Sequence, residues 1–153
     1  MLRRLLLLSA LSASLVSAAT LPYDETADAK AAVRQALASA RAARLPVLVI
    51  FGANWCEDCR ALDLALKSGA NAAQMTREFR VVKVDVGHFD RNLELSKAYG
   101  DPIKKGIPAA VLLSADNQVL YATRAGELAD ARRMSETGVH DFFKGVVEKS
   151  KAK

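Results

Sequence analysis

The chain has 153 residues, of which 51% are hydrophobic and 25% charged, and its formal net charge is +5. This length is enough for one domain with a core of its own. Part of the positive charge lies on the C-terminal Lys149, Lys151 and Lys153. No basic stretch is interleaved with aromatic residues, and we find no repeat or low-complexity tract, so the composition argues against a nucleic-acid-binding protein.

The first 18 residues have the pattern of a cleavable signal peptide. Arg3 and Arg4 precede an apolar stretch, and Val16-Ser17-Ala18 is typical of a cleavage site. The alternative is an uncleaved anchor, but a membrane span needs roughly 20 apolar residues and this stretch is shorter. No cysteine follows it to carry a lipid. We therefore expect export, to the periplasm in a bacterium, with residues 19–153 forming one domain.

Helical and strand patterns alternate along the rest of the chain. In order, we expect a helix over 24–44, a strand over 47–51, a helix over 56–67 with a second piece over 71–78, a strand over 81–86, a helix over 91–99, strands over 109–113 and 119–123, and a helix over 136–149. Strands joined by helices predict parallel pairing with right-handed crossovers, and the closing hairpin adds an antiparallel edge. The fold class is therefore α/β.

Local signals support the helices and the strands. Val33 and Leu37 fall on one face of the first helix, and Asp24 or Thr26 can cap it. Asp90 can cap the helix over 91–99 in the same way. The continuous apolar run over 47–51 is typical of a strand buried on both faces.

The two cysteines carry the strongest chemical signal in the sequence. Cys56 and Cys59 are the only cysteines, and they lie between a predicted buried strand and a predicted helix. The unpaired N–H groups and the positive end of a helix dipole favour a thiolate on the first cysteine. The second cysteine, one turn on, can close a disulfide with it. In an exported protein, a single close pair suits a working dithiol better than a structural scaffold.

Two other interpretations of the cysteine pair are weaker. A zinc site normally needs four ligands, and the only histidines, His88 and His140, do not cluster with the cysteines. A purely structural disulfide across so short a loop would constrain the unfolded chain little. Redox chemistry is therefore the favoured interpretation.

The order of elements, the Trp55-Cys56-Glu57-Asp58-Cys59 motif and Gly106-Ile107-Pro108 together resemble the thioredoxin superfamily over about residues 45–149. The resemblance implies a thioredoxin-like three-layer fold, with a central mixed sheet of about four strands flanked by helices. It also implies a thiol–disulfide oxidoreductase that needs neither a metal nor a bound cofactor, because the dithiol carries the electrons.

The resemblance implies a role for several residues. Cys56 would be the exposed nucleophile that forms a mixed disulfide with the substrate, and Cys59 the more buried resolving thiol. Trp55 would shield the pair and pack against the substrate. Ile107-Pro108, with a cis peptide bond, would face Cys56 and bind substrate backbone, and Gly126 would line the substrate groove.

The sequence departs from the usual thioredoxin pattern at a proton-relay position. Thioredoxins carry a buried aspartate six residues before the first cysteine, where this chain has Ile50. Lys83, at the position of a thioredoxin lysine in the central strand, therefore lacks its usual partner. We expect it to point to solvent or to another acid. Glu57 or Asp58 is then a candidate for proton transfer from Cys59.

Glu57 and Asp58 also bear on the direction of electron flow. Negative charge beside Cys56 destabilises its thiolate, and a less stable thiolate makes a more reducing couple. Ile107 before the proline resembles reducing thioredoxins. We predict a monomeric reductase of protein disulfides, recharged by a membrane electron donor of the DsbD type. The alternatives are an oxidase or isomerase, a narrow role such as haem-protein maturation, and a non-catalytic binding module on the same fold.

Overall fold

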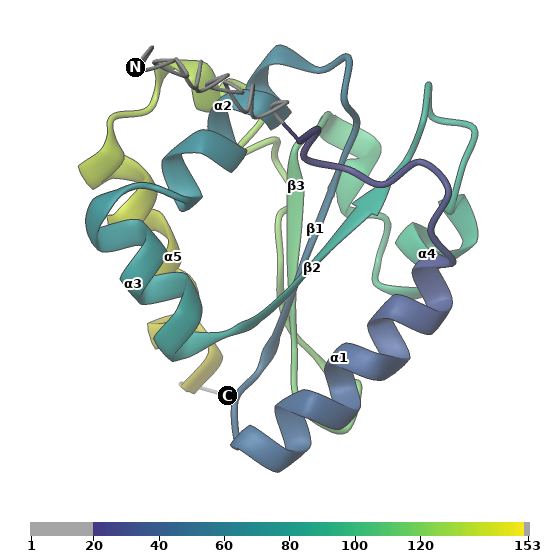
Figure 1. Cartoon of the computed structure of the whole chain (residues 1–153), viewed down its shortest axis with the longest axis vertical. Helices are drawn as coiled ribbons and strands as arrows, with labels where there is room; N and C mark the ends of the chain where they lie inside the picture. The colour runs from purple at the N-terminus through teal and green to yellow at the C-terminus, as the bar shows by residue number, and fades with distance from the viewer. Residues whose placement is uncertain (1–19, 152–153) are drawn as a thin grey trace, which may run out of the picture.

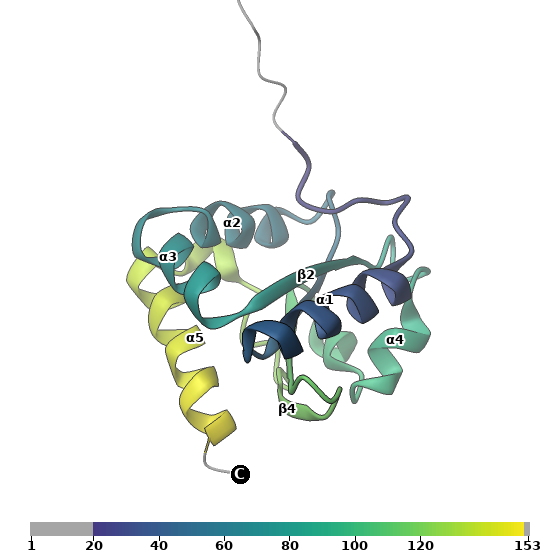
Figure 2. The same cartoon turned by 60° about the horizontal axis from the view of Figure 1, so that its bottom comes forward.

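The computed structural model describes residues 20–151, so the predicted signal peptide over residues 1–18 lies outside the described residues. A central sheet separates two layers of helices (Figures 1 and 2). Helices α1 (Ala29–Ala43) and α4 (Leu93–Ala98) cover one face of the sheet. Helices α2 (Glu57–Leu66), α3 (Gly69–Glu78) and α5 (Glu136–Lys151) cover the other. The predicted three-layer α/β architecture is confirmed.

The sheet has four strands in the order β2-β1-β3-β4. They are β1 (Val47–Gly52), β2 (Arg80–Asp85), β3 (Ala109–Leu113) and β4 (Val119–Ala122). As predicted, β1 and β2 pair in parallel and the β3–β4 hairpin is antiparallel. Strand β3 follows a helix but runs antiparallel to β1, with Phe51 opposite Ala109, which corrects the expectation that only the closing hairpin is antiparallel. The carboxyl ends of β1 and β2 and the beginning of β3 therefore lie side by side at one end of the sheet.

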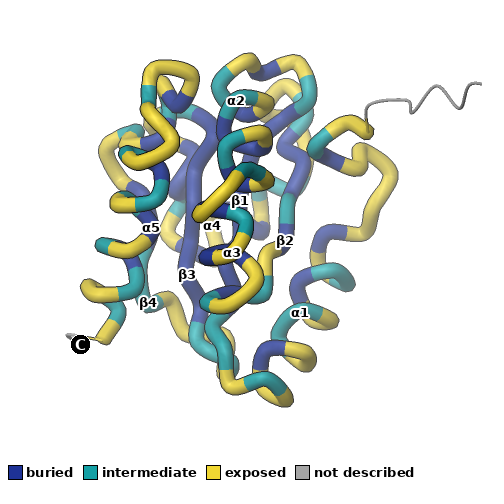
Figure 3. Tube along the Cα trace, turned by 60° about the vertical axis from the view of Figure 1, so that its left-hand side comes forward, coloured by how far each residue is buried: buried dark blue, intermediate teal, exposed yellow. Residues whose placement is uncertain are grey.

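Strand β1 lies at the centre of the core, and all six of its residues are buried (Figure 3). Val49 and Phe51 pack with α1 on one face, whereas Leu48 and Ile50 pack with α2, α3 and α5 on the other. This burial on both faces explains why the strand appears in the sequence as an unbroken apolar run. Among the described residues, no helix combines the length and apolar character needed to cross a membrane.

The predicted start of the first helix was wrong. Helix α1 begins at Ala29, and Asp28 caps it by accepting the N–H of Ala31 at 2.9 Å. Asp24 instead accepts the N–H of Thr26 at 2.8 Å and closes a turn of its own. The stretch before α1 holds several residues able to cap a helix. Because Asp24 and Thr26 bond to each other, neither of them caps α1.

The predicted cap of the fourth helix was also wrong. Helix α4 begins after Asn92, and Asp90 accepts the N–H of His88 at 2.9 Å within the preceding loop. The Asp90 carboxylate therefore stabilises the loop after β2 and not the helix.

Candidate active site

Ala53, Asn54 and Trp55 join the end of strand β1 to the N-cap residue of helix α2, and we call these three residues the cysteine turn. It places Cys56 at the N-cap of α2, at the carboxyl end of β1. The Cys56 Sγ accepts the backbone N–H of Cys59 at 3.1 Å, so the sulfur takes the position that a capping oxygen normally holds. The sequence prediction that this pair opens a helix is confirmed.

The two thiols differ sharply in acidity. Hydrogen bonding from the Cys59 thiol and from backbone N–H groups, opposed by burial and by the Asp58 carboxylate, lowers the pKa of Cys56 to about 7. The pKa of Cys59 is raised well above its usual range, first by the hydrogen bond with Cys56 and then by burial. Near neutral pH, Cys56 is thus a nucleophile with substantial thiolate character, and Cys59 stays protonated beside it.

Both cysteines are buried, which corrects the expectation of an exposed nucleophile. Cys56 is 6% exposed and Cys59 1%. The carbonyl oxygen of Ile107 lies 3.7 Å from the Cys56 Sγ and covers part of it. A substrate sulfur that reaches Cys56 therefore comes close to this carbonyl.

The loop before β3 supplies that carbonyl. The Ile107–Pro108 peptide bond is cis, as expected. Gly126 packs against the same loop: its φ is +75°, and a Cβ there would lie 2.8 Å from the carbonyl oxygen of Lys105. Only glycine combines this backbone conformation with so close an approach. Gly126 thus allows the chain to pack closely against the loop that carries Ile107.

Trp55 belongs to an exposed aromatic cluster that the sequence did not indicate. Trp55 is 48% exposed, and its indole N–H donates a hydrogen bond to the carbonyl of Gly87 at 2.8 Å. His88 stacks on it with ring centroids 5.3 Å apart, and Phe89 meets it edge-on at 6.3 Å. We call Trp55, His88 and Phe89 the aromatic patch. His88 and Phe89 follow a strand end in a loop, and no motif marks them.

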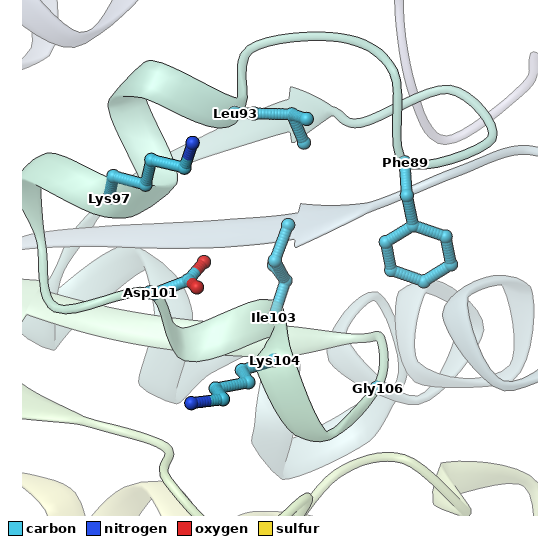
Figure 4. Close-up of a pocket in the computed structure, with 7 residues that line it drawn as sticks. All are labelled: Phe89, Leu93, Lys97, Asp101, Ile103, Lys104 and Gly106. Atoms are coloured by element: carbon cyan, nitrogen blue, oxygen red, sulfur yellow. The ribbon is translucent and has the colours of Figure 1, made fainter.

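A cavity of about 330 Å³ continues from the aromatic patch (Figure 4). It lies between the loop after β2, helix α4 and the 3₁₀ helix η1 (Pro102–Lys105), and is lined by Phe89, Leu93, Lys97, Asp101, Ile103, Lys104 and Gly106. Its lining combines apolar and charged side chains, and because Gly106 precedes Ile107, the cavity adjoins the loop that contacts Cys56.

The two acids between the cysteines are not free. Glu57 pairs with the Arg132 guanidinium at 3.1 Å, and Asp58 lies 3.6 Å from the same group. Asp58 also accepts the backbone N–H of Arg132 at 3.0 Å. The Asp58 carboxylate still raises the pKa of both cysteines. Of the two acids, Asp58 is therefore the one that acts on the dithiol.

Lys83 has a partner that the sequence did not reveal. Its ammonium forms an ion pair with the carboxylate of Asp63 in α2, and the Asp63 side chain is only 8% exposed. Ile50, at the usual aspartate position, is buried in the apolar core. The expectation that Lys83 turns to another acid is correct. The only sequence signal for Asp63 is an acid on the apolar face of α2.

Among residues 20–151, no group of three or more His, Cys, Asp or Glu side chains is arranged to hold a metal ion. What the described residues do bring together is a thiol of lowered pKa, a second thiol within bonding reach, a backbone carbonyl and an aromatic surface. This set can exchange a disulfide with another molecule.

Comparison with known proteins agrees with this geometry. A family model described as thioredoxin-like matches residues 28–115. The solved structure of a disulphide isomerase from Xylella fastidiosa Temecula1 is 55% identical, covers 85% of this chain and 99% of its own, and superposes with a TM-score of 0.83. No curated protein matches.

Two more distant structures share the fold alone. A thioredoxin from Thermus thermophilus is 20% identical over 74% of this chain and 80% of its own, with a TM-score of 0.53. A structure described as DsbH oxidoreductase is 16% identical over 95% of this chain and 94% of its own, with a TM-score of 0.54.

Proposed function

The chain belongs to the thioredoxin-like family, and from this premise we propose that it is an exported thiol–disulfide oxidoreductase that reduces disulfide bonds of other proteins. The observation that carries the proposal is the unequal pair of thiols at the start of α2. Cys56, with a pKa of about 7, can attack a substrate disulfide as a thiolate. Cys59 is buried and protonated, so it reacts only after the mixed disulfide has formed. A structural pair needs no such difference.

In the first step, the Cys56 thiolate attacks one sulfur of a substrate disulfide. A bond forms between Cys56 and that sulfur, the substrate S–S bond breaks, and the second substrate sulfur leaves as a thiolate. The N–H of Cys59, which bonds the Cys56 sulfur at 3.1 Å, orients the nucleophile and stabilises its charge.

In the second step, Cys59 loses its proton and attacks the Cys56 sulfur. The Cys56–Cys59 disulfide forms and the first substrate sulfur leaves. The Cys59 proton passes to the leaving substrate sulfur and the other substrate thiolate takes a proton from solvent, so the substrate gains two electrons and two protons. The dithiol supplies both electrons, and the reaction needs no bound cofactor or metal.

The substrate surface follows from what surrounds Cys56. Trp55 and its neighbours in the aromatic patch offer exposed rings for substrate side chains, and the Ile107 carbonyl, beside cis Pro108, offers an acceptor for a substrate backbone N–H. The adjoining cavity can take the next side chain of an extended segment. We assign no direct substrate contact to Gly126, which holds this loop in place.

The direction of electron flow rests on Asp58. Its carboxylate raises the pKa of Cys56, which makes the dithiol less stable and the couple more reducing. Glu57 adds little, because it is exposed and paired with Arg132. An exported reductase works in an oxidising compartment, so we propose a membrane electron donor of the DsbD type as the source of its electrons.

A disulfide isomerase is the second candidate. It is favoured by the 55% identity to the Xylella fastidiosa structure described as a disulphide isomerase. An isomerase uses the same first step but must release Cys56 from the mixed disulfide without net oxidation. The two functions therefore differ in how fast Cys59 resolves the intermediate.

The remaining parts of the proposal concern the whole chain. Residues 1–18 act as a signal peptide, residues 19–153 form one domain, and the mature protein works as a monomer in the periplasm. N-terminal sequencing of the exported protein would establish the cleavage, and light scattering its oligomeric state.

The reduction potential of Cys56–Cys59 against glutathione is the decisive measurement. A value near or below about −230 mV supports a reductase, and a value near about −120 mV overturns that direction in favour of an oxidase. Transfer of electrons from a reconstituted DsbD-type carrier tests the donor. A Cys56→Ser variant that kept full activity in the cell would mean that the fold serves only as a binding module.

A further inference from the structure

Tyr23 lies in the segment that precedes α1, yet it is only 3% exposed. Two hydrogen bonds with the Asn54 side chain hold its backbone: the Tyr23 N–H donates to Asn54 Oδ1 at 2.9 Å, and Asn54 Nδ2 donates to the Tyr23 carbonyl at 2.8 Å. Arg91 also donates to the carbonyl of Glu25. Because Asn54 belongs to the cysteine turn, these bonds fix Tyr23 to the redox site.

The phenol hydroxyl of Tyr23 reaches the resolving cysteine. A Cβ built on Gly52 would lie 2.9 Å from the Cys59 Sγ and closer still to the Tyr23 hydroxyl. The hydroxyl and the sulfur therefore lie on the same small patch of strand β1, which glycine leaves open for them. Tyr23 also belongs to the same buried cluster as Cys56 and Cys59.

The environment keeps this hydroxyl protonated. Burial raises the pKa of Tyr23 well above its usual value, and the nearby Cys59, Cys56 and Asp85 raise it further. A phenol in such a place acts as a hydrogen-bond donor and not as a base.

Cys59 needs such a donor when it carries charge. The hydrogen bond with Cys56, burial and the Asp58 charge all disfavour the Cys59 thiolate, and a backbone hydrogen bond at Ala53 favours it. The thiolate must nevertheless form when Cys59 resolves a mixed disulfide, and again when it is expelled as the site is re-reduced.

We propose that the Tyr23 hydroxyl donates a hydrogen bond to the Cys59 thiolate and thereby speeds the resolving step. This inference rests on the proposed function of the Cys56–Cys59 pair. No proton is transferred to or from Tyr23. The Cys59 proton leaves with the departing substrate thiolate, the Cys59–Cys56 bond forms, and the Cys56–substrate bond breaks. The same hydrogen bond stabilises Cys59 as the leaving group in the reverse direction.

The test follows the reaction of the reduced protein with Ellman's disulfide in a stopped-flow instrument. The first release of thionitrobenzoate reports attack by Cys56, and the second reports resolution by Cys59. We expect Tyr23→Phe, which keeps the ring, to slow the second release on the order of tenfold, as loss of a hydrogen bond to a charged group would, and to leave the first unchanged.

The matched control is Tyr99→Phe. Tyr99 is also buried in the same cluster, but its hydroxyl donates to Asn117, away from the cysteines. It should leave both releases unchanged. A normal second release in Tyr23→Phe, or an equal slowing of both releases, would overturn the inference and leave the proposed function standing. A wild-type protein that gave no first release would overturn both.

Discussion

Lys83 in β2 and Asp63 in α2 form an ion pair across the interface between the sheet and its helical layer. The lysine side chain is 22% exposed and the aspartate 8%. The second carboxylate oxygen of Asp63 accepts a hydrogen bond from Lys67 at 2.7 Å. Asp63 therefore has two cationic partners, whereas Asp63 is the only ion-pair partner of Lys83 within the described residues.

This asymmetry predicts unequal effects of removing either partner. Asp63→Leu leaves Lys83 largely buried without a counter-ion, and burial already lowers the pKa of that lysine. We expect a loss of about 2 kcal/mol in the free energy of unfolding, below the value for a fully buried pair. Lys83→Met leaves Asp63 paired with Lys67 and should cost about 1 kcal/mol or less. Urea denaturation of both variants and the double variant checks this. Equal losses would contradict it.

Alkylation of Cys56 by iodoacetamide should follow a pH profile with a midpoint near 7. The thiolate is the reactive form, so the rate rises as pH passes through the pKa of about 7 and levels off above it. Since the Cys59 thiol is the largest factor that lowers this pKa, Cys59→Ala should move the midpoint to higher pH. Cys59→Ser, which keeps a donor, should move it less. A midpoint indifferent to Cys59→Ala would refute the assigned cause.

Asp58→Asn should make the protein a weaker reductant. The Asp58 carboxylate raises the pKa of Cys56, so its neutralisation stabilises the thiolate and the reduced form. We expect alkylation at pH 6 to speed up on the order of twofold, and the reduction potential to rise. Glu57→Gln is the matched control, because Glu57 is exposed and already paired with Arg132. If both substitutions changed the alkylation rate and the reduction potential equally, the special role of the more buried Asp58 carboxylate would be refuted.

The sequence sufficed for those parts of the fold that depend on local patterns. The apolar runs of β1 and β3 and the cysteine pair at a helix start were predictable, because burial on both faces and N-capping leave a mark in consecutive residues. The starts of α1 and α4 were not, because more than one residue near each could act as a cap. Before α1, the local Asp24–Thr26 bond left Asp28 to act as the cap, and at α4 no side chain caps the helix.

The features missed at the candidate site are contacts between distant elements. Asp63 meets Lys83 from another layer, and His88 stacks on Trp55 from a loop after β2. Tyr23 lies before the first predicted strand and outside any motif. None of these contacts follows from periodicity or spacing. Each depends on the chain path that the sheet order imposes, so a single sequence could not reveal it.

His88 should contribute to substrate binding through Trp55. His88→Ala removes the ring stacked on the indole and frees Trp55 to change orientation. Because an aromatic pair is worth about 0.5–1.5 kcal/mol, we expect the KM for insulin disulfides to rise about three- to tenfold. The first release from Ellman's disulfide should not change. His140→Ala, in α5, is the control. A KM unaffected by His88→Ala would exclude the aromatic patch from the binding surface.

Gly52→Ala should destabilise the reduced protein even though alanine suits a strand no worse than glycine. Its Cβ would lie 2.9 Å from the Cys59 Sγ and would also meet the ring carbon and hydroxyl of Tyr23, all in a buried region. Overpacking of this kind costs about 1–3 kcal/mol. Gly145→Ala in α5 is the matched control: its Cβ meets no atom within 4 Å, and the helix should gain about 0.5–1 kcal/mol. Urea denaturation under reducing conditions measures both. If Gly52→Ala proved as stable as the wild type, Tyr23 would be free to leave the cysteines, and its fixed position beside Cys59 would be disproved.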